Sequence, residues 1–436
     1  MKLAVYLLGR RVATLESIGD FKTTLTYEAD ATANDFVSLT MPVRTESWSW
    51  DDSLHPIFRM NLPEGYLLHV LEERFGPHIG ASPIKLLSVV GRNMVGRLQV
   101  APLSSDLNEP LQLLDVADIL QGDNSEEAFS KLVHQYATSG VSGVVPKFLD
   151  AEKSFIRLSH YNKSTLFTRR HIIKGSTKQL PYVSLNEFLC MQVAAKILPT
   201  AKTQISLDGQ ALVVDRFDVD DKGQAYDALE DFCALLGLRP SAKYDTTWER
   251  IAKAVRDHVP GIRQRETFQH LATTILLTYA LRNADCHAKN IALLYSSRAD
   301  IHIAPIYDMV TTSVYTGYQD SPPGISFMGK KTWLPGKNLE KFLAATFGIS
   351  SREQIAIVEK ISAAMTETMP LVKEMMKEYS KFRELGKRML SAWTEGRENL
   401  RSQRMYALGS LVSQKALKEF SPAPKLRQPK RITGKE

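Results

Sequence analysis

A polar run that follows a long apolar stretch carries the strongest chemical signal in this sequence. It contains Asp285 and Asn290 with four residues between them. A carboxylate at the first position can orient a hydroxyl group and take its proton, and an amide oxygen at the second is a neutral ligand for Mg²⁺. The pair is therefore typical of phosphoryl transfer. A polar turn at the C-terminal cap of a helix is the other explanation, because this spacing is common by chance.

A second carboxylate strengthens the metal interpretation. Asp308 lies 18 residues after Asn290 and follows a predicted pair of short strands. Mg²⁺ prefers hard oxygen ligands, and one carboxylate, one amide and phosphate oxygens form a usual set. Asp308 would also fit as an ordinary turn residue after a strand. Its position relative to Asp285 and Asn290 favours one shared site.

Two further segments suit the binding of phosphates. Gly140 and Gly143 lie in the Gly/Ser-rich segment Ser139–Lys147, and their spacing lets backbone N–H groups approach an anion. Lys174 ends an apolar strand, as the ATP-phosphate lysine of protein kinases does, and Glu187 in the next predicted helix is placed to pair with it. A Gly/Ser turn and a solvated edge-strand lysine are the simpler explanations of these two features.

The charge near Lys174 favours an anion site, although a solvated face would also show it. Positions 153–186 hold seven Lys or Arg and no Asp or Glu. An apolar strand that ends at Asp215 and Phe217 is where a kinase hinge would present its backbone to adenine, but any buried strand has this pattern. Zinc at Cys286 and His287 is discounted, since no second Cys/His pair has ligand spacing. A hydrolase triad with Ser142 is discounted as well, because no Gly-x-Ser-x-Gly elbow exists.

Hydrophobic periodicity predicts the elements that would position these residues. Strands are predicted at Leu3–Leu8, Arg11–Leu15, Phe36–Met41, Leu98–Val100, Phe155–Leu158, Thr165–Phe167, His171–Lys174, Thr203–Ser206, Ala211–Phe217, Ile291–Leu294 and Ile301–Ala304. Helices are predicted at Pro56–Phe75, Ser184–Leu198, 268–281, 352–379 and 383–417, with a polar connector at 104–128.

This order predicts an α+β chain with a bilobal, protein-kinase-like fold: a β-rich lobe that carries an N-terminal α+β subdomain, then a helical lobe. The expected units are the N-terminal subdomain at 1–105, an ATP-binding lobe at 106–225, a helical catalytic lobe at 226–417 and a basic, disordered tail at 418–436. Layout alone is weak support for a function.

Composition sets broad limits on the class of protein. The 436 residues are 44% hydrophobic and 24% charged, which excludes a wholly disordered, collagen-like or rod-like chain. Three distant cysteines make no disulfide framework, and no signal peptide or membrane-length apolar run is recognised, so a soluble cytoplasmic protein without a membrane partner is expected. The net charge is +7, but residues 421–436 hold five basic residues and one acid, so the rest of the chain carries only +3.

Taken together, these motifs resemble the HipA family, the serine/threonine kinase toxins of type II toxin–antitoxin modules. The resemblance covers roughly residues 1–400. It is carried by the segments Phe58–Gly65, Leu86–Gly96, His171–Lys174, Arg216–Asp218, the run Asp285-x-His287-Ala288-Lys289-Asn290, and Tyr307-Asp308. The Asp-x-His-Ala-Lys-Asn run is specific, and with the other segments in the same order a chance match is not expected.

The resemblance implies a role for each matching residue. It makes Asp285 the catalytic aspartate, with His287 and Lys289 in the same motif, and makes Asn290 and Asp308 the Mg²⁺ ligands. ATP would be bound by Lys174, by the hinge at Asp215 and Phe217, and by the Gly-rich loop residues Ser142, Gly143, Val144 and Lys147. Relatives autophosphorylate a loop serine. Here Gly140 stands at that position, so Ser142 and Ser139 are the candidates.

The resemblance also implies partners. They are a protein substrate such as an aminoacyl-tRNA synthetase, a HipB-like helix-turn-helix antitoxin, and operator DNA bound through that antitoxin. Two alternatives stay open from the sequence. One is a non-catalytic co-repressor of the same fold, and the other is a small-molecule kinase.

Overall fold

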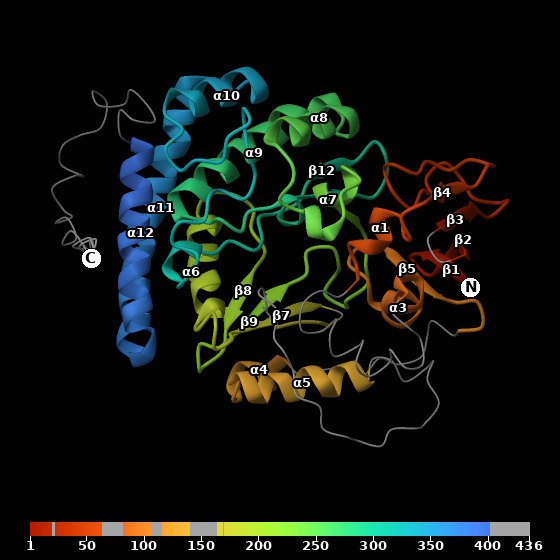
Figure 1. The fold of residues 1–436 in the computed structure, drawn as a ribbon, viewed down its shortest axis with the longest axis horizontal. Helices are drawn as coiled ribbons and strands as arrows, with labels where there is room; N and C mark the ends of the chain where they lie inside the picture. Colours follow the sequence, from red (N-terminus) through yellow and green to blue (C-terminus); the bar gives the residue numbers. More distant parts are fainter. Residues whose placement is uncertain (20–21, 63–81, 106–115, 140–163, 169, 402–436) are drawn as a thin grey trace, which may run out of the picture.

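The N-terminal part of the chain folds as a five-stranded antiparallel sheet in the order β4-β3-β2-β1-β5. The computed structural model describes residues 1–19, 22–62, 82–105, 116–139, 164–168 and 170–401 (Figure 1). The strands are β1 (Lys2–Leu7), β2 (Arg10–Ile18), β3 (Lys22–Tyr27), β4 (Trp48–Trp50) and β5 (Leu98–Pro102). Leu8 and Gly9 have φ angles of 50° and 80°, as a two-residue hairpin turn requires. The predicted strands Leu3–Leu8 and Arg11–Leu15 are confirmed, and the structure pairs them as a hairpin.

Among its described residues this unit also has two short α-helices, α1 (Pro56–Arg59) and α3 (Pro83–Val90). The predicted helix Pro56–Phe75 begins as expected, but its residues 63–75 lie outside the described part. The predicted strand Phe36–Met41 is wrong, since this segment is a turn closed by a bridge between Ser38 and Met41. Phe36 instead stacks on Tyr295 with ring centroids 5.4 Å apart, so burial against a distant segment replaces strand pairing.

A second antiparallel sheet has the order β6-β7-β9-β8. Its strands are β6 (Ser164–Phe167), β7 (His171–Gly175), β8 (Thr203–Ile205) and β9 (Ala211–Asp215). Because side chains alternate along a strand, Ile173 and Val213 pack under α4 (Val116–Gln121) and α5 (Glu126–Ser139), while Leu212 and Val214 pack on α6 (Val183–Ala195). Figure 1 shows α4 and α5 below this sheet and α6 above it. The predicted connector 104–128 therefore contributes part of a packed layer.

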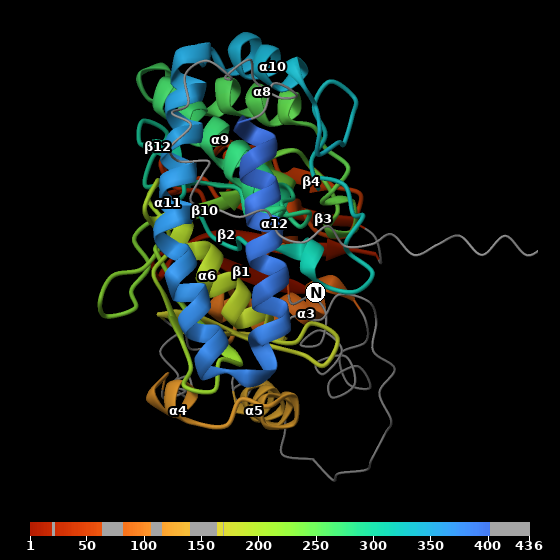
Figure 2. The same ribbon diagram turned by 90° about the vertical axis from the view of Figure 1, so that its left-hand side faces the viewer.

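The C-terminal half is helical around one buried helix. A small sheet, β10 (Ala228–Asp231), β11 (Ala292–Tyr295) and β12 (Ile301–Ile303), lies beside α7 (Phe232–Leu235), and β10 was not predicted. The buried helix is α9 (Gly261–Leu281), which contacts α8 (Trp248–His258), α10 (Lys337–Phe347), α11 (Ser351–Glu378) and α12 (Arg383–Arg401). Figure 2 shows α11 and α12 lying side by side. The predicted helices at 268–281 and 352–379 are confirmed. The helix predicted at 383–417 is described as far as Arg401.

Some predicted segments cannot be compared with the structure. The strand Phe155–Leu158, the glycine-rich loop from Gly140 to Lys147 and the tail 418–436 all lie outside the described residues. Within the described ranges, no helix combines the length and the apolar character that a membrane crossing needs.

A buried carboxylate joins the N-terminal sheet to the C-terminal half. Glu230 on β10 is fully buried. It accepts hydrogen bonds from the Ser38 hydroxyl at 2.6 Å, the Leu39 backbone N–H at 3.0 Å and the Tyr295 hydroxyl at 3.0 Å. Burial raises the pKa of Glu230 to about 7, although the three hydrogen bonds favour the charged form.

Replacing Glu230 with Gln is expected to flatten the pH dependence of stability. In the wild-type protein the folded state keeps a proton that the unfolded chain has released, because the pKa rises from 4.5 to about 7. The resulting stabilisation is full below pH about 4.5 and is lost as the pH rises through about 7. Thermal unfolding of both proteins at about pH 5 and about pH 8 measures this effect. An equal change in Tm with pH for the two proteins would contradict the prediction.

Candidate active site

One lysine links two carboxylates from different elements. Lys174 on β7 places its Nζ atom 2.6 Å from Glu187 Oε1 on α6 and 2.8 Å from Asp308 Oδ1, which follows β12. The side chains of Lys174, Glu187 and Asp308 are 13%, 2% and 21% exposed. Such largely buried charges persist only when they are paired. The ammonium group therefore lies between helix α6, which packs on the second sheet, and the loop after β12 in the helical half.

Local contacts explain how these three residues meet. The Ser184 hydroxyl donates to the Lys174 carbonyl oxygen at 3.0 Å, which aligns the start of α6 with β7. The Asn186 side chain donates to the Thr311 carbonyl oxygen at 2.9 Å and accepts from the Thr311 N–H at 2.9 Å. These two hydrogen bonds between the Asn186 side chain and the Thr311 backbone hold α6 against the segment that carries Asp308.

The loop that contains Asp285 begins where α9 ends. Arg282 caps α9 in the left-handed conformation, with φ at 56°, and turns the chain out of the helix. The Asp285 N–H then donates to the Asn283 side-chain oxygen at 3.0 Å, and the Ala284 N–H donates to the Thr312 hydroxyl at 2.8 Å. These bonds hold the backbone at Asp285 in one position.

Asp285 and Asn290 lie within one hydrogen-bonded loop. The Asn290 side-chain amide donates to the Asp285 carbonyl oxygen at 2.9 Å. This bond uses the amide nitrogen of Asn290 and not its amide oxygen. The hydroxyl group of Tyr244, on a neighbouring loop, donates a hydrogen bond to Asp285 Oδ1. The predicted turn therefore carries both side chains in a fixed relation.

His287 is close to Asp285 but is not its ion-pair partner. The distance from His287 Nε2 to Asp285 Oδ1 is 3.9 Å. Burial lowers the pKa of His287 to about 4, so the ring is neutral at pH 7. Its Nδ1 atom has no hydrogen-bond partner among the described residues. The Tyr244 ring lies edge-to-face against the His287 ring, with centroids 5.0 Å apart. The catalytic role of His287 stays a prediction.

Asp308 lies in a strained conformation beside the same loop. Its φ angle is 61°, a left-handed value that is uncommon for a residue other than glycine and is often found at functional sites. The preceding residue, Tyr307, donates its hydroxyl to the Lys289 carbonyl oxygen at 2.8 Å. Lys289 thus contributes its backbone to the contact between the two loops.

The two hinge residues differ in their surroundings. The Phe217 ring lies 5.8 Å from the Tyr307 ring, next to Asp308. The Asp215 side chain is 39% exposed, and its Oδ1 atom lies 3.7 Å from His171 Nε2. The structure therefore brings Phe217 near Asp308, while Asp215 is the last residue of β9 and pairs with His171 at the start of β7. The adenine-binding role of Asp215 stays a prediction.

The hinge is anchored to the N-terminal unit. Arg216 and Asp218 form an ion pair with Arg216 Nη2 2.5 Å from Asp218 Oδ2, and both residues are buried. The Gly96 N–H donates to Asp218 at 2.6 Å, and Arg216 donates to the Met94 carbonyl oxygen at 3.1 Å. The segments Leu86–Gly96 and Arg216–Asp218, which both carry the resemblance to the HipA family, thus contact each other.

Replacing Gly324 with Ala is expected to impair the Asp285 loop. A Cβ atom at this position would lie 2.2 Å from the Cys286 carbonyl oxygen and 2.9 Å from the Ala284 carbonyl oxygen. Because both contacts are to backbone, the loop must move, at a cost of about 1–3 kcal/mol. A displacement of about 1 Å at a reacting group lowers turnover about 10²-fold.

Thermal unfolding and phosphate release measure the two effects of the Gly324 substitution. Gly261→Ala is the matched control, since nothing lies within 4 Å of a Cβ atom there and the residue begins α9. The prediction is contradicted if the two variants have the same Tm and the same rate.

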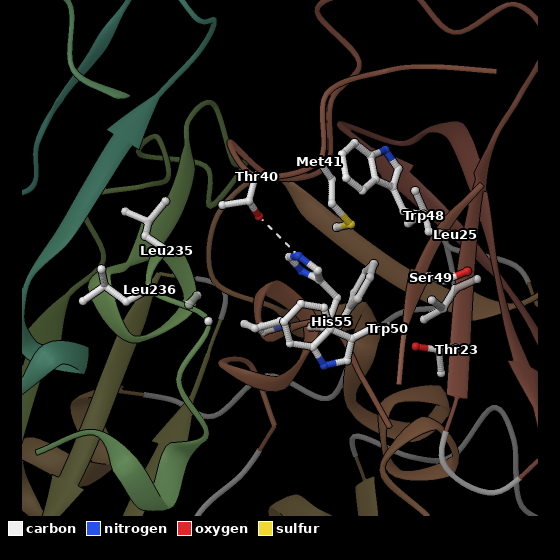
Figure 3. A pocket seen from close by; sticks show the side chains of 15 residues that line it. Thr23, Leu25, Thr40, Met41, Trp48, Ser49, Trp50, His55, Leu235 and Leu236 are labelled. Atoms are coloured by element: carbon white, nitrogen blue, oxygen red, sulfur yellow. Dashed lines mark hydrogen bonds between the residues drawn. The ribbon is translucent and has the colours of Figure 1, made fainter. Parts of the chain in front are cut away.

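A cavity of about 390 Å³ lies apart from this site. Figure 3 shows Trp48, Trp50 and His55 on one side of it and Leu235 on the other. His55 Nε2 lies 3.2 Å from the Thr40 hydroxyl, and burial lowers the pKa of His55 to about 3, so it is uncharged at pH 7. Size alone would make this cavity a candidate ligand site. Its uncharged, largely apolar wall does not suit the phosphates of a nucleotide.

Two family models and two curated relatives match this chain. A model described as "HipA-like C-terminal domain" matches residues 139–369, and one described as "HipA N-terminal domain" matches residues 3–101. The "Putative kinase Y4dM" of Sinorhizobium fredii (strain NBRC 101917 / NGR234) is 25% identical over 345 residues, which are 73% of this chain and 79% of the relative. The "Putative kinase Y4mE" of the same organism is 26% identical over 321 residues, 68% and 73% of the two chains.

A solved structure has the same fold. It is HipA of Shewanella oneidensis MR-1 in complex with HipB and its operator DNA, with a TM-score of 0.65 and 18% sequence identity. The match covers 92% of this chain and 99% of the other. The mixed α/β architecture of this chain is therefore the fold of that HipA structure.

Proposed function

Since the chain belongs to the HipA family of kinases, we propose that it is an ATP-dependent serine/threonine protein kinase of the cytoplasm and the toxin of a toxin–antitoxin module. The observation that carries the proposal is the position of Lys174. Its ammonium group holds Glu187 and Asp308 together, and Asp308 in turn lies beside the loop of Asp285 and Asn290. We further propose that the molecule is bilobal, with domain limits near residues 105, 225 and 417.

In the proposed mechanism Lys174 neutralises ATP phosphates, and Asp285 takes the proton of the acceptor hydroxyl. The donor set fits Mg²⁺, because Asp308 offers carboxylate oxygen and the Asn290 amide nitrogen is engaged with the Asp285 carbonyl. Asn290 and Asp308 would hold the ion, which supplies neutralisation of phosphate charge when it is bound. Phe217 would face the adenine. The Gly-rich loop residues Ser142, Gly143, Val144 and Lys147 are proposed to cover the phosphates.

Transfer of labelled phosphate tests the proposal. The full-length protein is incubated with γ-labelled ATP, Mg²⁺ and a cell lysate, and phosphopeptides are mapped by mass spectrometry. We expect label on serine or threonine of a protein, for which an aminoacyl-tRNA synthetase is the proposed acceptor. Label on a small molecule alone would contradict a protein kinase, and no transfer would favour a non-catalytic co-repressor. The same map shows whether Ser139 or Ser142 is autophosphorylated.

We also propose a helix-turn-helix antitoxin partner and, through it, operator DNA. The support is the Shewanella oneidensis relative of the same fold, whose structure contains HipB and operator DNA. With only +3 of the net charge outside residues 421–436, direct binding of residues 1–420 to DNA is not favoured.

A further inference from the structure

A tyrosine hydroxyl binds the proposed catalytic carboxylate. Tyr244 belongs to the loop between Pro240 and Thr247, which joins the small sheet to α8. Its hydroxyl donates a hydrogen bond to Asp285 Oδ1. We infer that Tyr244 occupies the position of the acceptor hydroxyl and is a specificity residue, which the protein substrate displaces when it binds. The inference rests on the proposed kinase function.

The chemistry of the contact supports this inference. A kinase acceptor presents an O–H group to the catalytic carboxylate, and Tyr244 presents the same group to the same residue. A carboxylate oxygen that already accepts this proton is less available to a second hydroxyl. The substrate must therefore compete with a charge-assisted hydrogen bond, which is one of the stronger kinds in proteins.

The backbone of the Tyr244 loop is fixed while its side chain is accessible. The Lys243 carbonyl oxygen accepts from the Ala288 N–H at 3.1 Å, and the Tyr244 carbonyl oxygen accepts from Lys331 Nζ at 3.0 Å. Thr247 caps α8 with its side chain and forms a bridge with Ser326. The Tyr244 side chain itself is only partly buried. Rotation of one side chain, without movement of the loop, can therefore open the position next to Asp285.

A purely supporting role makes the opposite prediction. If Tyr244 served to hold Asp285 in place, removal of its hydroxyl would lower turnover. Asp285 is already held through its backbone by Asn283 and Asn290. Loss of the phenol oxygen should therefore leave the carboxylate in place and open it to solvent.

Phosphate release from Mg-ATP without any protein acceptor tests the inference. In this reaction a water oxygen attacks the γ-phosphorus, the bond from phosphorus to the β-phosphate oxygen breaks, Asp285 takes the water proton, and ADP leaves. Tyr244→Phe is expected to raise this rate about tenfold, the factor that corresponds to loss of one competing hydrogen bond to a charged group. The Kd for Mg-ATP should be unchanged, and the KM for dephosphorylated casein, a generic acceptor, should fall.

Controls separate this inference from the proposed function. Tyr379→Phe removes a tyrosine hydroxyl that donates to the Leu207 carbonyl oxygen and does not bind Asp285. This substitution should leave the rate of phosphate release unchanged. The gain from Tyr244→Phe should disappear when it is combined with Asp285→Asn. An equal or lower rate in Tyr244→Phe, or phosphate covalently bound to Tyr244, would overturn the inference while wild-type transfer still supports the proposed function. Failure of the wild-type protein to bind Mg-ATP would count against both.

Discussion

The Asp285→Asn protein is expected to transfer phosphate at least about 10²–10⁴-fold more slowly than the wild-type protein, the range that a positioned general base contributes. Asn is nearly the same size and can still accept the hydrogen bond from Tyr244, so the loop should keep its shape. It cannot take a proton from the acceptor. The initial rate of transfer from γ-labelled ATP measures the effect, with saturating Mg-ATP for both proteins.

Binding and stability show whether the loss at Asp285 is chemical. The Kd for Mg-ATP and the Tm should stay close to the wild-type values. Asp257→Asn is the control, because Asp257 forms an exposed pair with Lys253 on α8 and such pairs contribute little. Equal labelling by wild-type and Asp285→Asn proteins would exclude Asp285 as the catalytic residue.

The Lys174→Met protein is expected to lose both activity and stability. Met keeps most of the apolar stem, but the ammonium group between Glu187 and Asp308 disappears. Glu187 is 2% exposed, so loss of the Lys174 ammonium leaves a buried carboxylate without that charge beside it, at a cost of about 3–5 kcal/mol. ATP would also lose the charge proposed to neutralise its phosphates. Denaturant unfolding and Mg-ATP titration measure the two losses.

A double variant separates the two roles of Lys174. Lys174→Met combined with Glu187→Gln also removes the buried negative charge that Lys174 neutralises, so we expect stability to recover in large part. Mg-ATP binding and phosphate transfer should stay low, because the positive charge is still missing. Recovery of transfer in the double variant would show that Lys174 acts only on the fold. Glu367→Gln, which breaks an exposed pair with Lys196 at 3.1 Å, is the matched surface control.

The sequence predicted the local features of the site well, because local patterns control them. The change from an apolar helix to a polar turn predicted the loop of Asp285, and the structure ends α9 at Leu281. The apolar run before Lys174 predicted β7, and the predicted pair with Glu187 exists at 2.6 Å. The catalytic and ligand roles of these residues stay predictions until the kinetic experiments are done.

Sequence patterns failed where distant contacts decide the conformation. The alternation in Phe36–Met41 is that of a strand, but the contacts of Ser38 and Leu39 with Glu230, almost 200 residues later, fold it as a turn. The short strand β10 was missed because more than 50 residues, most of them helical, separate it from its partner β11. Local preference is a weak force when burial and hydrogen bonds from another part of the chain compete with it.

The sequence by itself determined the candidate chemistry: which residue types lie at which spacing, and which elements precede them. Only the tertiary structure decided which of these residues meet. It joined Lys174 to Asp308 across 134 positions and Tyr244 to Asp285 across 41. The physical reason is that side-chain hydrogen bonds act over about 3 Å, and packing, which no local pattern records, sets those distances.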